Sequence, residues 1–218
     1  MSLKTRYLLL YNLLSLLVWA TLLVWATLLA HTCYDVVKGD LAPLLPLVTV
    51  AQTAQVAEVL HAALGLVRAS PATTALQVGG RNLVVWTVMR RFPDLVFATA
   101  AAAPGYGRYG FVGCLLAWAA SDVLRYAFFV AQMGVGRAPG ALVWLRYSAF
   151  ILLYPVGFLS EASLVYLGLA NARDISLFYR GYLFVGLLAY IPASYILYTY
   201  MFSQRRRALK QRGQVKKG

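Results

Sequence analysis

The sequence predicts an all-α protein that crosses a membrane several times, as a six-transmembrane helix bundle around a central polar cavity. Of its 218 residues, 61% are hydrophobic and 12% are charged, and the mean hydropathy is +0.67. A soluble domain is far more polar than this. The apolar residues form stretches of about 20, the length that a helix needs to cross a bilayer. Within these stretches the polar residues recur every three, four or seven positions.

Six spans account for the apolar stretches in chain order. The first is too long for the apolar part of a secretory signal, and no clear cleavage site follows it. The third is the least apolar, because Arg81 lies inside it. The stretch Leu95–Ala103 is too short to cross, so we expect a loop or an interfacial segment there. The expected spans are Tyr7–Ala30, Leu44–Val67, Thr74–Met89, Tyr109–Ala131, Leu142–Leu169 and Tyr182–Met201.

The basic residues predict the orientation and the division of the chain. Seven of the 20 Lys and Arg residues lie in residues 205–218, directly after the last span. Such a cluster normally faces the cytosol and contacts anionic lipid. Its placement therefore favours a membrane surface over nucleic acid, despite the net charge of +13. We expect a membrane domain (1–204), a basic cytosolic tail (205–218) and both termini in the cytosol, although Arg90, Arg91 and Arg108 would then face the opposite side.

Polar side chains mark one face on each of four consecutive spans. Ionisable side chains within a membrane normally face the interior of a bundle. The simplest packing therefore points these faces at one another around the cavity. They consist of Gln52, Gln55, Glu58, His61, Gly65 and Arg68 in the second span, Gln77 and Arg81 in the third, Asp122, Arg125 and Tyr126 in the fourth, and Tyr147, Tyr154, Glu161 and Gly168 in the fifth.

Several of these charged residues also have a purely structural interpretation. Asp122 and Arg125 fit an ion pair that only holds helices together, and Glu58 fits a carboxylate neutralised by Arg81 or His61. No metal is predicted, since His61 has no second histidine near it in the sequence.

Arginines near the expected cytosolic boundary have two interpretations. Their long side chains either extend to water from the edge of the membrane or bind the phosphates of an anionic substrate. For substrate binding we single out Arg68, Arg81 and Arg146.

The most informative feature is a tyrosine and a carboxylate in one apolar stretch, Tyr154 and Glu161. A carboxylate inside a membrane costs about 3 kcal/mol on insertion scales, so it is rarely there without a task. Seven positions return to nearly the same helix face, about 10.5 Å along the axis. A phenol and a carboxyl on one helix face are suited to acid–base chemistry.

One apparent motif is set aside. Residues 61–68 resemble the tyrosine-phosphatase signature, a short string in which a histidine, a cysteine, a glycine and an arginine occupy fixed positions. Ala62 replaces the cysteine nucleophile, and without a thiolate there is no phosphoenzyme chemistry. The segment is also expected to be an apolar helix rather than a phosphate-binding loop.

Several motifs resemble the very-long-chain (3R)-3-hydroxyacyl-CoA dehydratases, a family first called protein tyrosine phosphatase-like proteins, and especially its plant members. The central one is the string Tyr-Pro-x-Gly-x-x-x-Glu at residues 154–161. The sequence departs at Asp122, where glutamate is expected more often. Matching pieces elsewhere are Glu58 with His61, Gly65 with Arg68, Gln77 with Arg81, Trp118, Asp122 with Arg125 and Tyr126, and Arg146 with Tyr147.

The resemblance implies an enzyme of the endoplasmic reticulum membrane that acts in the third step of microsomal fatty-acid elongation. It would remove water from a (3R)-3-hydroxyacyl-CoA to give the trans-2-enoyl-CoA, without a metal or redox cofactor. Expected partners are the other elongase enzymes: the condensing enzyme, the ketoacyl-CoA reductase and the enoyl-CoA reductase. The motif match implies that Tyr154 and Glu161 are catalytic. The candidates for substrate binding are Glu58, Arg68, Arg81, Asp122, Arg125, Arg146 and Tyr147.

Dehydration needs a base for the proton on Cα and an acid for the departing hydroxyl. We expect Glu161 to be the base and Tyr154 to be the donor; the reverse assignment, or a carboxyl serving both steps, is compatible with the residues. Two other classes of function are also compatible with the sequence. One is a catalytically inactive phosphatase-like membrane scaffold that binds phosphorylated or elongase partners. The other is a small transporter or proton channel, for which interrupted helices in two matched halves are expected and are not seen in the sequence.

Overall fold

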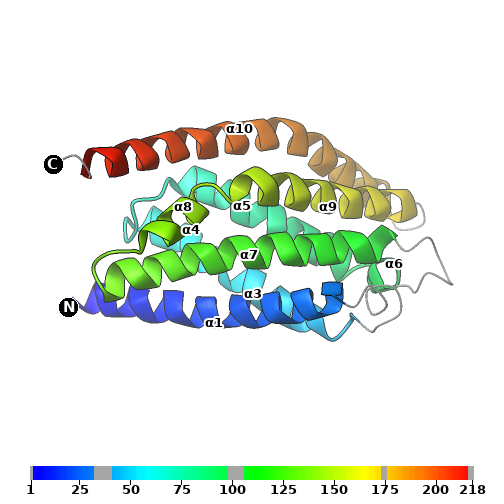
Figure 1. Ribbon diagram of the computed structural model, residues 1–218. Helices are drawn as coiled ribbons and strands as arrows, with labels where there is room; N and C mark the ends of the chain where they lie inside the picture. The colour runs from blue at the N-terminus through cyan, green and yellow to red at the C-terminus, as the bar shows by residue number, and fades with distance from the viewer. Residues whose placement is uncertain (1, 32–40, 98–105, 173–175, 216–218) are drawn as a thin grey trace.

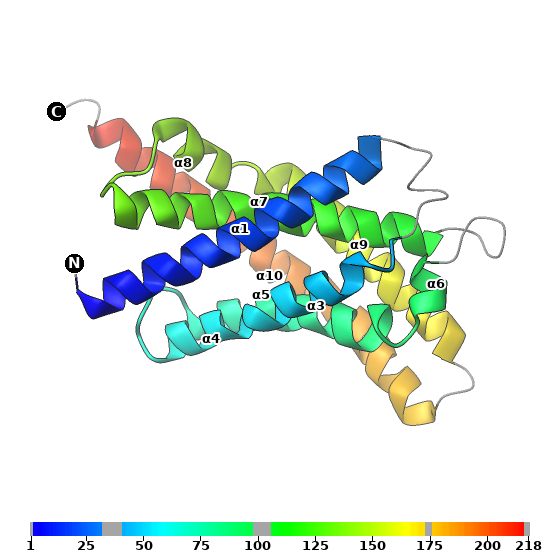
Figure 2. The same cartoon turned by 90° about the horizontal axis from the view of Figure 1, so that it is seen from below.

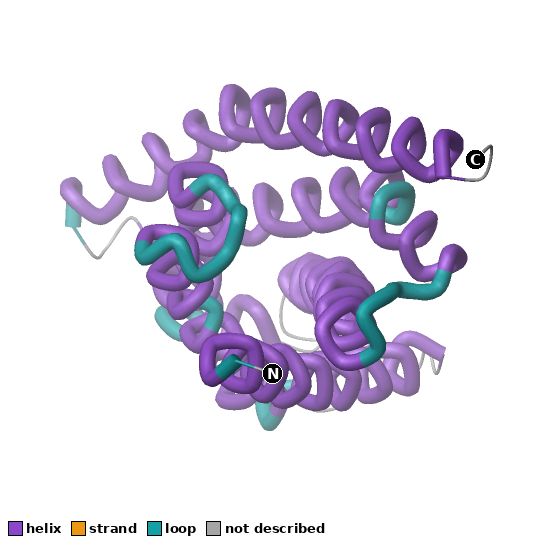
Figure 3. Tube along the Cα trace, turned by 90° about the vertical axis from the view of Figure 1, so that its left-hand side faces the viewer, coloured by secondary structure: helices purple, strands orange, loops and turns teal. Residues whose placement is uncertain are grey.

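The computed structural model describes residues 2–31, 41–97, 106–172 and 176–215, and all regular elements in these ranges are helices (Figure 1). Figure 3 shows the same ranges as helix and loop, without a strand. The predicted all-α class is therefore confirmed. The helices are α1 (Leu3–His31), α3 (Leu44–Ala54), α4 (Val56–Ala63), α5 (Pro71–Val84), the π-helix η1 (Val85–Met89), α6 (Pro93–Phe97), α7 (Tyr106–Gly134), α8 (Gly140–Arg146), α9 (Phe150–Asn171) and α10 (Leu177–Val215).

Four helical segments in the described ranges are long and apolar enough to cross a membrane: Leu3–Thr27, Tyr106–Gly134, Gly140–Asn171 and Leu177–Lys210. They correspond to the first, fourth, fifth and sixth predicted spans. The second and third predicted spans are built from shorter pieces, α3 with α4 and α5 with η1. The chain is thus a helical membrane protein, and the count of six spans stays a prediction.

Helix α7 is the centre of the arrangement. It packs against α1 on one side and α9 on the other, and α10 lies against α9 (Figures 1 and 2). Four of the largest fully buried side chains come from α1 and α7: Trp19, Phe111, Trp118 and Tyr126. The two termini lie at the same end of the bundle (Figure 1). The loop between α4 and α5 also lies at this end, and α6 lies at the other.

Small residues bring α7 and α9 unusually close together. A Cβ atom added to Gly113 of α7 would lie 2.2 Å from Oγ of Ser160 on α9, closer than Cβ atoms approach non-bonded atoms in proteins. A Cβ on Gly157 would lie 3.3 Å from Cβ of Ala117. Association of helices in lipid depends on such close packing, because apolar side chains gain little by leaving lipid for one another. This contact holds α7 against α9 at the level of the polar residues of α7.

Helix α4 ends with a glycine cap that explains the phosphatase-like outline. Gly65 has a φ of +66°, the left-handed conformation that glycine adopts without strain. The amide of Leu66 donates to the carbonyl of His61 at 2.8 Å, and the amide of Gly65 donates to Ala62 at 3.2 Å. This is the Schellman pattern of a helix C-terminus. The second predicted span therefore ends as a helix at Ala63, four residues earlier than expected.

The fifth predicted span is interrupted near its start. Helix α8 ends at Arg146 and α9 begins at Phe150, so the turn at residues 147–149 separates them. Tyr147 consequently does not continue the face of α9 as its heptad spacing predicted; its ring contacts Phe128 of α7, with 6.3 Å between the ring centres. At the other end of the chain, α10 runs unbroken past residue 204. The division into a membrane domain and a tail at that position stays a prediction.

Candidate active site

Asp122 is the centre of a buried polar network that joins three segments of the bundle. Oδ2 accepts from Nη1 of Arg81 at 2.8 Å and from Nε2 of Gln55 at 2.7 Å. Oδ1 pairs with Nη2 of Arg125 at 2.9 Å. The predicted Asp122–Arg125 ion pair is therefore present, but Asp122 also holds α5 and the junction between α3 and α4. Buried charges are tolerated in this way, with each one paired and hydrogen-bonded.

Glu58 closes the other end of this network. Its carboxylate pairs with the guanidinium of Arg125 and accepts from the hydroxyl of Tyr126. Neither partner that we expected for Glu58 holds it, because Arg81 reaches Asp122 and His61 bonds with the hydroxyl of Tyr7 at 2.9 Å. The two carboxylates and the two arginines balance in charge. The geometry supports a cluster that fixes α4, α5 and α7 relative to one another.

The predicted polar face of the second span points inward as far as His61, whereas Gly65 and Arg68 are exposed beyond the end of α4. Gln52 and Gln55 are buried, and Glu58 and His61 contact α7 and α1 respectively. Gln52 is fully buried, and its side-chain nitrogen and oxygen have no hydrogen-bond partner in the described part of the chain.

Glu161 lies outside the balanced cluster, held by two neutral donors. Nε1 of Trp118 donates to Oε1 at 2.7 Å, and the hydroxyl of Tyr190 donates to Oε2 at 3.0 Å. Among the described residues it forms no ion pair, unlike Glu58 and Asp122. Trp118 also contacts the cluster, because the guanidinium of Arg81 lies 5.7 Å from the centre of its ring. Glu161 is therefore oriented but not neutralised by a paired cation.

Tyr154 lies on the same side of α9 as Glu161. Its hydroxyl donates to the backbone carbonyl of Ser194 at 3.3 Å, and its ring stacks on Tyr198 with 5.3 Å between the ring centres. Ser194, Tyr198 and Tyr190 all belong to α10. Both predicted catalytic side chains thus face α10, rather than pointing in different directions. In the described ranges no hydrogen bond joins the two directly. The ring of Phe158 contacts the rings of both Tyr154 and Tyr190.

The remaining predicted binding residues lie towards the end of the bundle that carries the termini. Arg146 packs its guanidinium on Phe128, 4.3 Å from the ring centre, and donates to the backbone carbonyl of Arg125 at 3.3 Å. Arg68 is exposed in the loop after α4. Arg205 of α10 donates to Oγ of Ser148, just after Arg146, at 3.2 Å. Arg81 and Arg125, by contrast, bind carboxylates of the protein itself.

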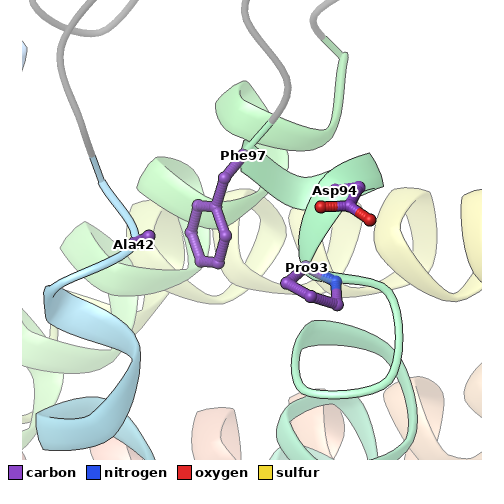
Figure 4. A pocket seen from close by; sticks show the side chains of 4 residues that line it. All are labelled: Ala42, Pro93, Asp94 and Phe97. Carbon is purple, nitrogen blue, oxygen red and sulfur yellow. The ribbon is translucent and has the colours of Figure 1, made fainter.

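A pocket of about 260 Å³ lies away from these residues (Figure 4). It is lined by Ala42, Pro93, Asp94 and Phe97, at the end of the bundle opposite the termini. It offers one carboxylate and otherwise small or apolar groups. The central polar cavity of the sequence analysis stays a prediction.

Two contacts of the site were not predicted from the sequence. Tyr190 was one of 15 tyrosines, and nothing in its spacing linked it to Glu161, 29 positions earlier. Trp118 was noticed only as a matching residue. Trp118 precedes Asp122 by one helical turn and so lies on the polar face of α7. This spacing could have indicated that Trp118 belongs to the site.

The arrangement is suited to proton transfer. A carboxylate held at both oxygens by neutral donors keeps a second acceptor direction on each oxygen, and a phenol lies two helical turns away. Metal-ligating side chains do not gather in groups of three or more within the described ranges.

Known proteins provide a comparison for this geometry. The family model described as protein tyrosine phosphatase-like protein, PTPLA, matches residues 52–211. An Arabidopsis thaliana protein named very-long-chain (3R)-3-hydroxyacyl-CoA dehydratase PASTICCINO 2 is 34% identical, over 94% of this chain and 93% of its own length. A Schizosaccharomyces pombe protein named probable very-long-chain (3R)-3-hydroxyacyl-CoA dehydratase is 34% identical, over 96% and 95%.

A third relative, from Caenorhabditis elegans, is named very-long-chain (3R)-3-hydroxyacyl-CoA dehydratase hpo-8 and is 31% identical over 96% of each chain. No solved structure matches the chain at a significant level. The family match begins within α3 and ends within α10, so it includes Trp118, Tyr154, Glu161 and Tyr190. The chain belongs to the protein tyrosine phosphatase-like protein family.

Proposed function

We propose that this protein is a hydro-lyase that converts very-long-chain (3R)-3-hydroxyacyl-CoA into trans-2-enoyl-CoA, in the third step of fatty-acid elongation. The observation that carries the proposal is the environment of Glu161, a carboxylate within a membrane-spanning helix that is held by two neutral donors and has no paired cation among the described residues. A carboxylate that served packing alone would be expected to resemble Asp122, which is paired to two arginines. The names of the relatives support the same reaction.

In the proposed mechanism Glu161 is the base and Tyr154 is the acid. One oxygen of Glu161 takes the proton from Cα of the substrate, and the electron pair of that C–H bond forms the Cα–Cβ double bond. The Cβ–O bond breaks, and the hydroxyl leaves as water with a proton that Tyr154 supplies. General acid–base catalysis of this kind contributes about 10²- to 10⁴-fold to a rate. The proton then passes from Glu161 back to Tyr154 through solvent.

The proposed placement of the substrate follows the charges of the bundle. We place the CoA at the end that carries the termini, where Arg68 and Arg146 would contact its phosphates, and the acyl chain in a central cavity between six spans. Tyr147 would line the mouth. Glu58, Asp122, Arg81 and Arg125 would act on the substrate indirectly, by holding α4, α5 and α7. Guanidinium groups are well matched to phosphate geometry.

The proposed cellular setting is the endoplasmic reticulum membrane, with both termini in the cytosol and residues 205–218 as a basic tail at the lipid surface. There the protein would receive its substrate from a ketoacyl-CoA reductase and pass its product to an enoyl-CoA reductase. The two termini lie at the same end of the bundle, which supports their placement on one side of the membrane (Figure 1).

The experiment that tests the function is a direct assay. Purified protein in detergent is given a (3R)-3-hydroxyacyl-CoA, and the enoyl product is measured by chromatography. We expect turnover by the natural sequence and loss of at least about 10²-fold with Glu161→Gln. Asp94→Asn is the matched control, because Asp94 is an exposed carboxylate away from the site. Product formation by Glu161→Gln at the natural rate would refute the role of Glu161. Absence of turnover by the folded natural protein over a range of chain lengths would favour the scaffold.

A further inference from the structure

Tyr190 is the phenol nearest to the proposed base. Its hydroxyl donates to Oε2 of Glu161 at 3.0 Å, whereas the hydroxyl of Tyr154 is directed at the backbone carbonyl of Ser194. Tyr190 is partly buried, and its ring packs against Phe158 with 5.8 Å between the ring centres. The ring is therefore held from α9 and the hydroxyl is held on the carboxylate.

The two hydrogen bonds to Glu161 come from different helices. Helix α7 supplies the bond from Trp118 to Oε1, and α10 supplies the bond from Tyr190 to Oε2. With one donor on each oxygen, the plane of the carboxylate is fixed and rotation about its last bond is opposed. Ser194 lies one turn after Tyr190 and accepts from Tyr154, so one face of α10 touches both proposed catalytic groups.

We propose that Tyr190 is a positioning residue, which fixes the orientation of the Glu161 carboxylate together with Trp118 so that an oxygen of Glu161 reaches the Cα proton. This rests on the proposed function. Tyr190 forms no bond to the substrate in this proposal and exchanges no proton with it. A charge-assisted hydrogen bond is about twice as strong as a neutral one, so the orientation is maintained while Glu161 is ionised. Reactions of this kind are sensitive to misplacement by about 1 Å.

The alternative is that Tyr190 only attaches α10 to α9. The two roles differ in what they change. A tyrosine that only attaches a helix would affect the melting temperature and the fraction of active protein, but the pH dependence of each active molecule would be unaltered. A tyrosine that orients the base changes the turnover number and the pH profile, since the hydroxyl bonds directly to the group that titrates.

The test is Tyr190→Phe in the full chain in detergent, with saturating and limiting (3R)-3-hydroxyacyl-CoA. We expect kcat to fall by about 10- to 100-fold, the magnitude of a hydrogen bond to a charged group, and KM to change less than about twofold. The pH at which kcat reaches half its maximum should move by about half a unit or more. Tyr195→Phe is the control, because Tyr195 lies on the same helix and is 73% exposed.

A second variant removes the other donor. Trp118→Phe should also lower kcat, and the double variant should lose less than the product of the two single losses, because both residues act through one carboxylate. Natural kcat and an unchanged pH profile in Tyr190→Phe, while the natural protein turns over substrate, would overturn the inference and leave the proposed function standing. A lower melting temperature with unchanged kcat per folded molecule would overturn it as well. If the natural protein itself makes no product, the proposed function fails and the inference fails with it.

Discussion

At the scale of single residues, the three carboxylates inside the bundle, Glu58, Asp122 and Glu161, have different environments. Asp122 and Glu58 are each bound by arginine, whereas Glu161 is bound by an indole and a phenol. A carboxylate paired with arginine is a poor base, because its lone pairs and its charge are already engaged. The site can thus be separated into a charge-balanced frame around Asp122 and a reactive carboxylate beside it.

Asp122→Asn tests the frame. The amide has a single acceptor oxygen, so it cannot serve Arg81, Gln55 and Arg125 together, and it leaves two arginines against the single charge of Glu58. We expect a lower melting temperature in detergent. A double-mutant cycle with Arg81→Gln should give a coupling energy of about 0.5–3 kcal/mol, since the two side chains are in direct contact. Additive effects would contradict the contact.

Tyr154→Phe tests the proposed acid. The substitution keeps the ring that stacks on Tyr198 and removes only the hydroxyl, whose bond to Ser194 is long. We expect the melting temperature to change little and the rate of enoyl-CoA formation to fall by about 10²-fold or more. The same rate as in the natural protein would leave Glu161 as both base and acid. Tyr166→Phe, on the exposed face of the same helix, is the control.

The residues that could be predicted from the sequence were those that share a helix. The spacing of Tyr154 and Glu161 indicated a common face, and both do face α10. Tyr190 could not be predicted, because periodicity relates positions within one helix and gives no information on which helix will lie opposite. For the same reason the partner of Glu58 was predicted wrongly. The sequence suggested Arg81 or His61, and the structure shows Arg125.

At the scale of elements, the contact between α7 and α9 determines where Trp118 meets Glu161. Gly113 lies against Ser160, and Gly157 lies against Ala117, so the two helices approach at the level of the site. The hydrophobic pattern predicted the long helices well but not the breaks within them. The turn at residues 147–149 and the early end of α4 depend on local capping and on packing against α7, which the average hydropathy of a segment does not contain.

Gly113→Ala tests this contact. The new Cβ would lie 2.2 Å from Oγ of Ser160, and 3.2 Å from its Cβ, so the hydroxyl of Ser160 must move. Because the Cβ contact stays tight after the hydroxyl rotates, we expect α7 and α9 to separate slightly and the bond from Trp118 to Glu161 to weaken. We expect a lower melting temperature and lower activity. Combining it with Ser160→Gly removes the obstructing atoms and should restore both. Gly79→Ala is the control, because no atom lies within 4 Å of its added Cβ.

Failure of Ser160→Gly to improve Gly113→Ala would contradict the proposed contact. An effect of Gly79→Ala as large as that of Gly113→Ala would show instead that glycine in any of these helices is needed for folding.

At the scale of the whole molecule, the two termini lie at one end of the bundle, with the loop that carries Arg68, and Asp94 lies at the other (Figures 1 and 4). The basic tail predicts that the first end is cytosolic. In sealed microsomes, a membrane-impermeant thiol reagent should label Arg68→Cys directly and Asp94→Cys only after permeabilisation, in a chain whose Cys33 and Cys114 are replaced by alanine. The opposite labelling pattern would invert the orientation.

The position of Tyr190 on the last helix has a consequence for how the protein is made. Glu161 enters the membrane with α9, before the ribosome has synthesised α10, and it then lacks the donor for its second oxygen. A carboxylate in lipid costs about 3 kcal/mol on insertion scales. A polypeptide that stops short of α10 is therefore expected to hold Glu161 in the bilayer less favourably than the full chain, because only the bond from Trp118 remains.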